Sequence, residues 1–268
     1  MSIRVIINNF TRNIRNKQIF IQYQKILNTF FTPTFLWNQI INDYPAYFNK
    51  NQEKQNVFVF VMKTLVLKIF WFWPSLGSAD SWRDYEFEDV MGAQAYVELD
   101  EQGLRLMNEV VSRTTDENSV LLDLGCNIGR FLNYLAEKGY KNINGVDVSK
   151  VAIESMGTTF PALSGISTVK LQTMQEYLLN TDSNSIDVVY THGATVELVP
   201  ATFPLVKEIC RICNEYVVFM INENGHLFPR FWEHEFKMNN FDLVKLERPF
   251  YENGKIMGNS LLVFKKRQ

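Results

Sequence analysis

Short apolar stretches with strand character alternate with helical segments from residue 119 onward, and this alternation constrains the fold more than any other feature. The expected strands are VLLDL, NINGVDV, GISTVKLQ, SIDVVYTH and EYVVFMI. The expected helices between them are GRFLNYLAEKG, which Gly139 ends, SKVAIESM, which Ser149 caps, and ATFPLVKEICRIC. Strands that alternate with helices form a parallel sheet with helices on both faces. The pattern therefore predicts an α/β fold.

The end of the chain departs from this alternation. Two strand candidates, FDLVKLER and NSLLVFKK, are joined by a segment that contains Asn253-Gly254. Asparagine-glycine pairs between strands are typical of tight hairpin turns. The sequence therefore predicts that the sheet ends in a C-terminal antiparallel hairpin.

The region before the first strand has a different character. Residues 1–68 carry nine Lys or Arg and two Asp or Glu, a balance of +7, whereas the remainder carries 18 basic and 27 acidic residues. Apolar residues at three- to four-residue spacing predict a helix that ends near Arg113, and polar TTDENS follows it. We therefore expect a mainly helical N-terminal extension or cap over residues 1–115 and an α/β domain over 116–268. The basic segment fits either an anionic partner or a solvated surface against the acidic domain.

The stretch from Val57 to Trp73 is almost entirely apolar but contains Lys63 and Lys68. Each lysine would cost roughly 2.5–3.5 kcal/mol near the centre of a bilayer, so a membrane span is disfavoured. A buried or interdomain helix that ends at Pro74 and a helix at a membrane surface both fit the pattern.

The three cysteines are too few and too unevenly spaced for a disulfide framework, which indicates a reducing compartment. Asparagines and basic residues interrupt the first 25 positions, where a secretory signal needs an apolar run. We expect a cytoplasmic protein, with membrane association as an alternative through residues 57–73. Cys210 and Cys213 have C-x-x-C spacing without a second pair, so packing is favoured over redox chemistry or zinc, and we expect no metal.

The segment VLLDLGCNIGRF, residues 120–131, predicts a sharp turn from a strand into a helix. Ligands of open α/β sheets bind beyond the carboxyl ends of the strands, where this turn lies. Gly125 and Gly129 permit a close approach of the backbone to a ligand, and Asn127 tolerates positive φ. Asp123 could accept hydrogen bonds from loop amides or hold an ammonium group.

The same segment argues against a dinucleotide. The fingerprint G-x-G-x-x-G, counted from Gly125, needs glycines at positions 127 and 130, where the sequence has Asn127 and Arg130. Asp147 lies eighteen residues after Gly129 at the end of the second strand candidate, where a carboxylate receives ribose hydroxyls. The site therefore suits a nucleoside without a pyrophosphate.

These residues resemble the class I S-adenosylmethionine-dependent methyltransferases. Their first motif, D/E-x-G-x-G-x-G, is similar to DLGCNIG except at Asn127, and Asp147 in GVDVS matches their second acidic position. The segment from Ser185 to Phe219 is similar to the fourth strand, loop and fifth strand of ubiquinone-type O-methyltransferases, with ELVP at residues 197–200 in place of Glu-His-Val-Pro. The resemblance covers roughly residues 118–268. It implies a Rossmann-like seven-stranded methyltransferase sheet and S-adenosyl-L-methionine as the cofactor.

The resemblance also implies roles for individual residues. Catalysis is expected of His192, as a base, and of Glu197, as a second base or orienting partner; a structural histidine and a solvated or capping glutamate are the alternatives. Met174 would cover the adenine, or else pack in the core. The expected cofactor-binding residues are Asp123, Gly125, Cys126, Asn127, Gly129, Asp147, Val148, Met174 and Thr191.

Additions before the first strand commonly cap the active site in such enzymes, so Trp82, Tyr85 and Tyr96 would form an aromatic lid or else belong to the core. His226 and His234 suit surface or substrate-wall positions better than metal ligation. The expected function is methyl transfer to an oxygen, less favourably a nitrogen, of a small metabolite or saccharide. The alternatives are an RNA or protein methyltransferase that uses the basic segment, and a catalytically silent module at a membrane surface; nucleic acid is not the favoured partner.

Overall fold

The computed structural model describes residues 94–193, 196, 199, 203–221, 230, 232–247, 251–252, 255–256 and 259–268. The chain divides into two units, Met1–Leu76 and Gly77–Gln268, and every described residue belongs to the second. Most of the expected N-terminal extension therefore lies outside the described residues and stays a prediction. The same holds for the apolar stretch 57–73 and for Trp82, Tyr85, Glu197, His226 and the Asn253-Gly254 pair.

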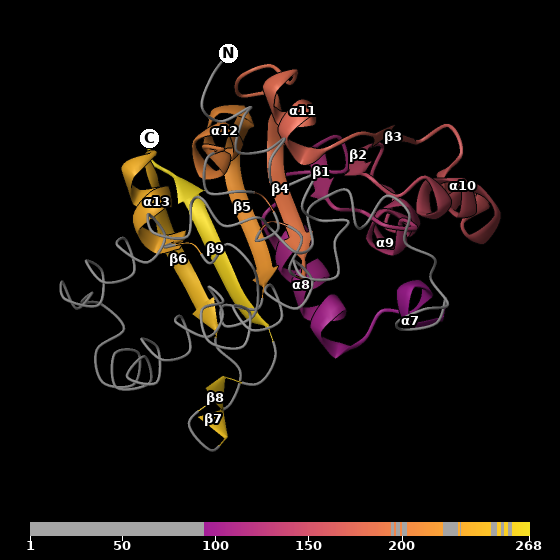
Figure 1. The fold of residues 1–268 in the computed structure, drawn as a ribbon, viewed down its shortest axis with the longest axis horizontal. Coiled ribbons are helices and arrows are strands. Elements are labelled where there is room, and N and C mark those ends of the chain that lie inside the picture. Colours follow the sequence, from indigo (N-terminus) through magenta and orange to yellow (C-terminus); the bar gives the residue numbers. More distant parts are fainter. Residues whose placement is uncertain are drawn as a thin grey trace, which may run out of the picture. The chain divides into compact units, whose positions relative to one another are not determined.

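Seven strands form one sheet in the order β3-β2-β1-β4-β5-β9-β6, which the labels in Figure 1 follow from right to left. Neighbouring strands among β1 to β5 are parallel, whereas β9 runs antiparallel between β5 and β6. This arrangement confirms the α/β fold with a C-terminal antiparallel hairpin. The strands are β1 (Val120–Leu124), β2 (Asn142–Asp147), β3 (Ser167–Leu171), β4 (Ile186–His192), β5 (Cys213–Ile221), β6 (Phe241–Glu247) and β9 (Ser260–Lys266).

A short separate pair, β7 (Tyr251–Glu252) and β8 (Lys255–Ile256), lies between β6 and β9 in the sequence. The two are antiparallel, with Tyr251 opposite Ile256. Asn253-Gly254 lies between these two short strands in the sequence, whereas the longer strands β6 and β9 pair with each other in the main sheet.

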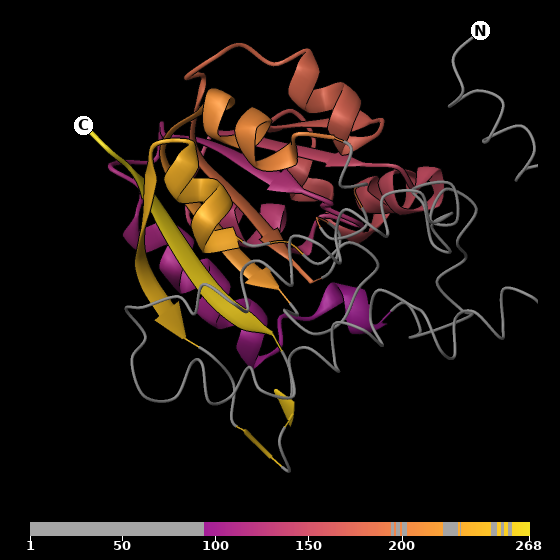
Figure 2. The same cartoon turned by 60° about the vertical axis from the view of Figure 1, so that its left-hand side comes forward.

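Helices cover both faces of the sheet, as Figure 2 shows. The alternation of side chains along β1 separates two cores: Leu121 packs with α8, α9 and α10, whereas Leu122 and Leu124 pack with α11, α12 and α13. The helices are α7 (Gln94–Val97), α8 (Glu101–Ser112), α9 (Arg130–Glu137), α10 (Lys150–Thr159), α11 (Met174–Leu179), α12 (Leu205–Ile212) and α13 (Trp232–Met238).

Local signals explain most helix ends. α8 ends at Ser112, as the sequence predicts, and Ser149 caps α10 by accepting a hydrogen bond from the amide of Ala152 at 3.2 Å. Asp100 begins α8 by accepting the amide of Gly103 at 2.7 Å, and this cap separates α8 from α7. α11 was not predicted from the helical pattern; a capping box between Thr173 and Glu176 begins this helix.

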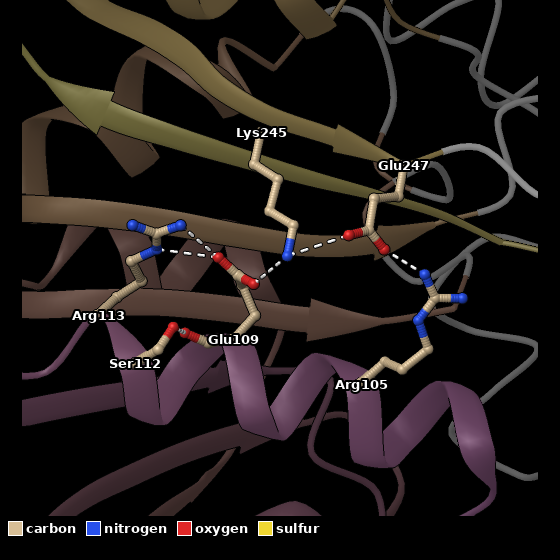
Figure 3. Close-up of polar contacts among 6 residues, drawn as sticks. All are labelled: Arg105, Glu109, Ser112, Arg113, Lys245 and Glu247. Atoms are coloured by element: carbon tan, nitrogen blue, oxygen red, sulfur yellow. Dashed lines mark hydrogen bonds and ion pairs between the residues drawn. The ribbon is translucent and has the colours of Figure 1, made fainter.

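An ionic network joins α8 to β6 on one face of the sheet (Figure 3). Glu109, only 7% exposed, accepts hydrogen bonds from Arg113 at 2.5 Å and from Lys245 at 2.6 Å. Lys245 also pairs with Glu247 at 3.0 Å, and Glu247 pairs with Arg105. Burial, the largest influence, raises the pKa of Glu109, but Lys245 and Arg113 outweigh it and hold the pKa below its usual value. Every charge in this network therefore has a partner.

None of the described helices combines the length and apolar character that crossing a bilayer requires.

Candidate active site

The loop between β1 and α9 makes the sharp turn that its glycines predict. Gly125, Asn127 and Gly129 all have positive φ, at 85°, 49° and 87°. A Cβ on Gly129 would lie 2.9 Å from Cε of Met156 and 3.1 Å from Cδ1 of Leu163. The left-handed backbone conformation therefore requires glycine at position 129, and a larger residue would also displace the ends of the Met156 and Leu163 side chains.

Asp147 lies at the mouth of this loop, at the carboxyl end of β2. Its Oδ2 accepts the amide of Asn127 at 2.8 Å, and its Oδ1 accepts the amide of Ser149 at 2.8 Å. Burial raises the pKa of Asp147, although the amides of Ser149, Asn127 and Val148 lower it in part. A carboxylate has about four acceptor sites, so Asp147 could still receive a hydroxyl group while it holds the loop.

Asp123 lies one position before the end of β1 and is fully buried. Neither of its carboxylate oxygens has a hydrogen-bond partner among the described residues. Burial, together with the negative charge of Asp147, raises the pKa of Asp123 well above its usual value. An ammonium group would supply the missing hydrogen bonds and charge, so the site fits the cationic amino-acid arm of S-adenosylmethionine.

Cys126 occupies the same loop with its side chain turned toward β2. A Cβ on Gly145 would lie 2.8 Å from the Cys126 sulfur, so Gly145 makes room for the thiol. The thiol is buried, and burial raises its pKa well above the usual value. Cys126 therefore supports the loop as a packed neutral side chain.

At the end of β4, Thr191 and His192 point to opposite faces of the sheet. The hydroxyl of Thr191 donates to the carbonyl of Leu124 at 2.7 Å and holds β4 against the end of β1. The ring of His192 lies 5.3 Å from the ring of Phe131, and its Nε2 has no hydrogen-bond partner within the described part of the chain. Burial and the charge of Arg130 lower the pKa of His192 to about 4, so the ring is neutral at pH 7.

Val148, Met174 and Glu197 are the other predicted site residues. Val148 is half-buried directly after Asp147, and Met174 begins α11, where it packs in part against the core shared with α12. Core packing therefore accounts for at least part of the Met174 side chain. Glu197, the second predicted catalytic residue, lies outside the described residues.

The two cysteines with C-x-x-C spacing, Cys210 and Cys213, are free and buried. Cys210 is in α12 and Cys213 begins β5. Burial raises the pKa of both thiols, that of Cys213 to about 12, so neither is a reactive thiolate at neutral pH. No group of three His, Cys, Asp or Glu in the described ranges is placed to hold a metal ion.

Arg130 lies at the start of α9, and the dinucleotide comparison noted it only as a missing glycine. Its guanidinium donates to the carbonyl of Glu98 at 3.0 Å and lies 4.7 Å from the ring of Phe131. The preceding Tyr96 packs near Ile128 of the glycine loop. The segment from Tyr96 to Glu98 therefore packs near the glycine loop. This position fits both alternatives for Tyr96, a lid and a part of the core.

Arg230, which is 7% exposed, is not among the residues predicted from the sequence. Its Nη2 donates to the carbonyls of Val199 at 3.2 Å and Phe203 at 3.4 Å, and its Nη1 pairs with Glu235 at 3.4 Å. Arg230 thereby joins the connection after β4 to the connection after β5, at the carboxyl edge of the sheet. No motif marks this residue, because its partners are backbone carbonyls of distant residues.

Comparison with known proteins gives a consistent result. Residues 121–215 match the family described as a methyltransferase domain. The chain is 27% identical over 212 residues to EEF1A lysine methyltransferase 2 of Danio rerio, with 73% of this chain and 90% of the relative covered. It is 29% identical over 160 residues to EEF1A lysine methyltransferase 2 of Homo sapiens, with 54% of this chain and 65% of the relative covered.

Among solved structures, the fold is similar to magnesium protoporphyrin IX methyltransferase from Synechocystis PCC 6803 with bound SAM. The TM-score is 0.52 at 15% identity, and the match covers 76% of this chain and 96% of that one. The family match, the sheet order and the glycine loop with its acidic partner agree with one another. The chain therefore contains a methyltransferase domain with the fold of the class I S-adenosylmethionine-dependent methyltransferases.

Proposed function

We propose that the enzyme transfers the methyl group of S-adenosylmethionine to a lysine nitrogen of a protein. The observation that carries this proposal is the similarity to EEF1A lysine methyltransferase 2, which extends over 90% of the zebrafish protein. The oxygen of a small metabolite or saccharide, which the sequence analysis favoured, stays a prediction with less support. A protein as the methyl acceptor, the alternative predicted from the sequence, agrees better with these relatives.

We assign cofactor binding to the carboxyl edge of β1, β2 and β4. The glycine loop brings backbone close to the ligand, Asp147 receives the ribose hydroxyls, and Asp123 receives the ammonium group. When bound, S-adenosylmethionine supplies a methyl group that its sulfonium already activates. Much of the catalysis is therefore the positioning of donor and acceptor.

The lysine must lose a proton before its nitrogen can attack. A lysine ammonium has a pKa near 10.4 in water, and a partly desolvated site favours the neutral amine. Direct proton transfer to His192, whose pKa is about 4, spans about six pKa units, on the order of 8 kcal/mol. In our proposal the proton therefore leaves to solvent, and the neutral His192 orients the amine by accepting a hydrogen bond. During transfer the nitrogen–carbon bond forms, the carbon–sulfur bond breaks, and the positive charge moves from sulfur to nitrogen.

The test is transfer of tritiated methyl from labelled donor by the purified full chain. The acceptors are a size-fractionated cell extract and purified EEF1A, the protein that appears in the names of both relatives. We expect label in the protein fraction, and methyl-lysine by mass spectrometry of the labelled band.

Two variants make this assay specific. Asp147→Ala removes the expected ribose ligand and should abolish labelling. Asp187→Ala is the matched control, because Asp187 also accepts a backbone amide, that of Val120 at 2.8 Å, but at the amino end of β1. Label that appears only in small molecules or RNA would overturn the lysine proposal and leave the enzyme class intact.

A further inference from the structure

Tyr190 lies beside Asp123 in the middle of the sheet. The two residues are opposite each other in the parallel pairing of β1 and β4, so their side chains lie on the same face of adjacent strands. Both residues have no exposed surface. Asp123 is two positions before Gly125, where the glycine loop begins.

Both side chains carry buried polar atoms without hydrogen-bond partners among the described residues. Within the described residues, the Tyr190 hydroxyl and both Asp123 carboxylate oxygens lack a hydrogen-bond partner. An unsatisfied buried polar group costs about 1–3 kcal/mol, and more when it is charged. Burial and the neighbouring Asp123 charge both raise the pKa of Tyr190, so the two groups affect each other although they are not bonded. Native cores rarely keep such groups together unless a ligand or water completes them.

The chemistry that would satisfy both groups is limited. A carboxylate needs donors, and an ammonium group supplies three of them with the opposite charge. A phenol hydroxyl can donate to a carboxylate or accept from an ammonium group. An amino acid's α-ammonium and α-carboxylate together provide both kinds of partner. An apolar ligand or a purine ring would leave the buried aspartate uncompensated.

We propose that Tyr190 is a cofactor-binding residue, whose hydroxyl acts beside the Asp123 carboxylate to bind the amino-acid end of the methionine arm. The sequence analysis placed Asp123 in this role but passed over Tyr190, because its segment reads as an ordinary buried strand. The inference depends on the cofactor alone, so it is independent of whether lysine is the acceptor.

The test compares two ligands that differ at this end. S-adenosylhomocysteine has the amino-acid group, whereas 5′-methylthioadenosine has the same nucleoside and thioether without it. Calorimetric titration of Tyr190→Phe should show S-adenosylhomocysteine binding weakened by roughly 10- to 100-fold, the range of one hydrogen bond to a charged group. Binding of 5′-methylthioadenosine should be unchanged.

Thermal unfolding without ligand separates binding from a structural role. Tyr190→Phe removes a buried hydroxyl without a partner, so the ligand-free midpoint should stay the same or rise. Tyr140→Phe is the matched control: Tyr140 is also buried, but its hydroxyl is bonded to Thr114 at 2.5 Å. That variant should lower the midpoint and bind both ligands normally.

Asp123→Asn is a second variant that tests the same binding role. It keeps the shape but removes the charge, so it should also weaken S-adenosylhomocysteine selectively. The proposal is overturned if Tyr190→Phe weakens both ligands equally, if it weakens neither, or if it lowers the ligand-free midpoint as Tyr140→Phe does. The last result would mean that an internal water satisfies the hydroxyl.

Discussion

Buried carboxylates have opposite surroundings in two regions of the molecule. One region is the ionic network between α8 and β6, and the other is the carboxyl edge of β1 and β4. Glu109 is nearly buried and has two basic partners, which lower its pKa. Asp123 is fully buried, has no hydrogen-bond partner in the described ranges, and has a strongly raised pKa. Glu109 is in α8, which packs with Leu121 of β1, and Asp123 is on the same face of β1 as Leu121.

This difference separates a structural role from a ligand-binding one. A carboxylate whose partners come from its own chain is complete in the folded protein and stabilises it. A carboxylate without such partners destabilises the empty protein, and a ligand that supplies them gains affinity. The contrast predicts that substitutions in the network act on folding, whereas substitutions at the edge act on binding.

The largest effect is expected for Asp147→Ala, which would sharpen the contrast on the binding side. The substitution removes the acceptor for the amides of Asn127 and Ser149 as well as the expected ribose ligand. We expect S-adenosylhomocysteine affinity to fall at least about a hundredfold, or about 3 kcal/mol, by calorimetry. Asp187→Ala should leave the affinity unchanged; an equal loss in both variants would show that the effect is on folding.

On the folding side, Glu109→Ala should lower the free energy of unfolding by about 2 kcal/mol, because it leaves Arg113 and Lys245 without their shared buried partner. Glu154→Ala, in the exposed Lys150–Glu154 pair, should change it by less than about 0.5 kcal/mol. Denaturant unfolding measures both. If Glu109→Ala weakened cofactor binding while stability was retained, the network would have a role in binding, contrary to the separation of the two regions.

A substitution at Arg230 tests whether a buried charge that has partners also contributes to acceptor binding. Arg230→Lys keeps the charge but loses the geometry that reaches both Val199 and Phe203, so stability should fall by about 1–2 kcal/mol. Because these contacts join the connections after β4 and β5, KM for the acceptor should rise more than the affinity for S-adenosylhomocysteine falls. Equal changes in both would assign Arg230 to the core alone.

The smallest effect concerns the pH dependence of His192. Its folded pKa of about 4 lies below the unfolded value of 6.5, so the unfolded state takes up a proton first as pH falls. This histidine should therefore reduce stability between pH 6.5 and 4, by about 1 kcal/mol at pH 5.5. His192→Asn should lose that slope in denaturant unfolding measured across this pH range. A variant that keeps the full slope would mean that the His192 ring is not shielded from water.

The sequence predicted the sheet well because alternating strand and helix patterns are local signals. Ser149 as a cap, the helix end near Arg113 and the final pairing of β6 with β9 all follow from short segments. α11 was missed because its six residues are too few for a clear helical period, and only the capping box marks it. The β7–β8 pair was not predicted, because a turn signal in the sequence does not specify which strands flank it.

The sequence by itself determined the glycine loop, the acid that follows it and the cofactor class, since these depend on backbone conformation and spacing along the chain. Only the tertiary structure decided which buried polar groups have partners. Arg230 finds its partners some thirty residues away, whereas Tyr190 and Asp123 find none in the described residues. Hydrogen-bond satisfaction depends on where distant strands and loops meet, and residue order does not encode it directly.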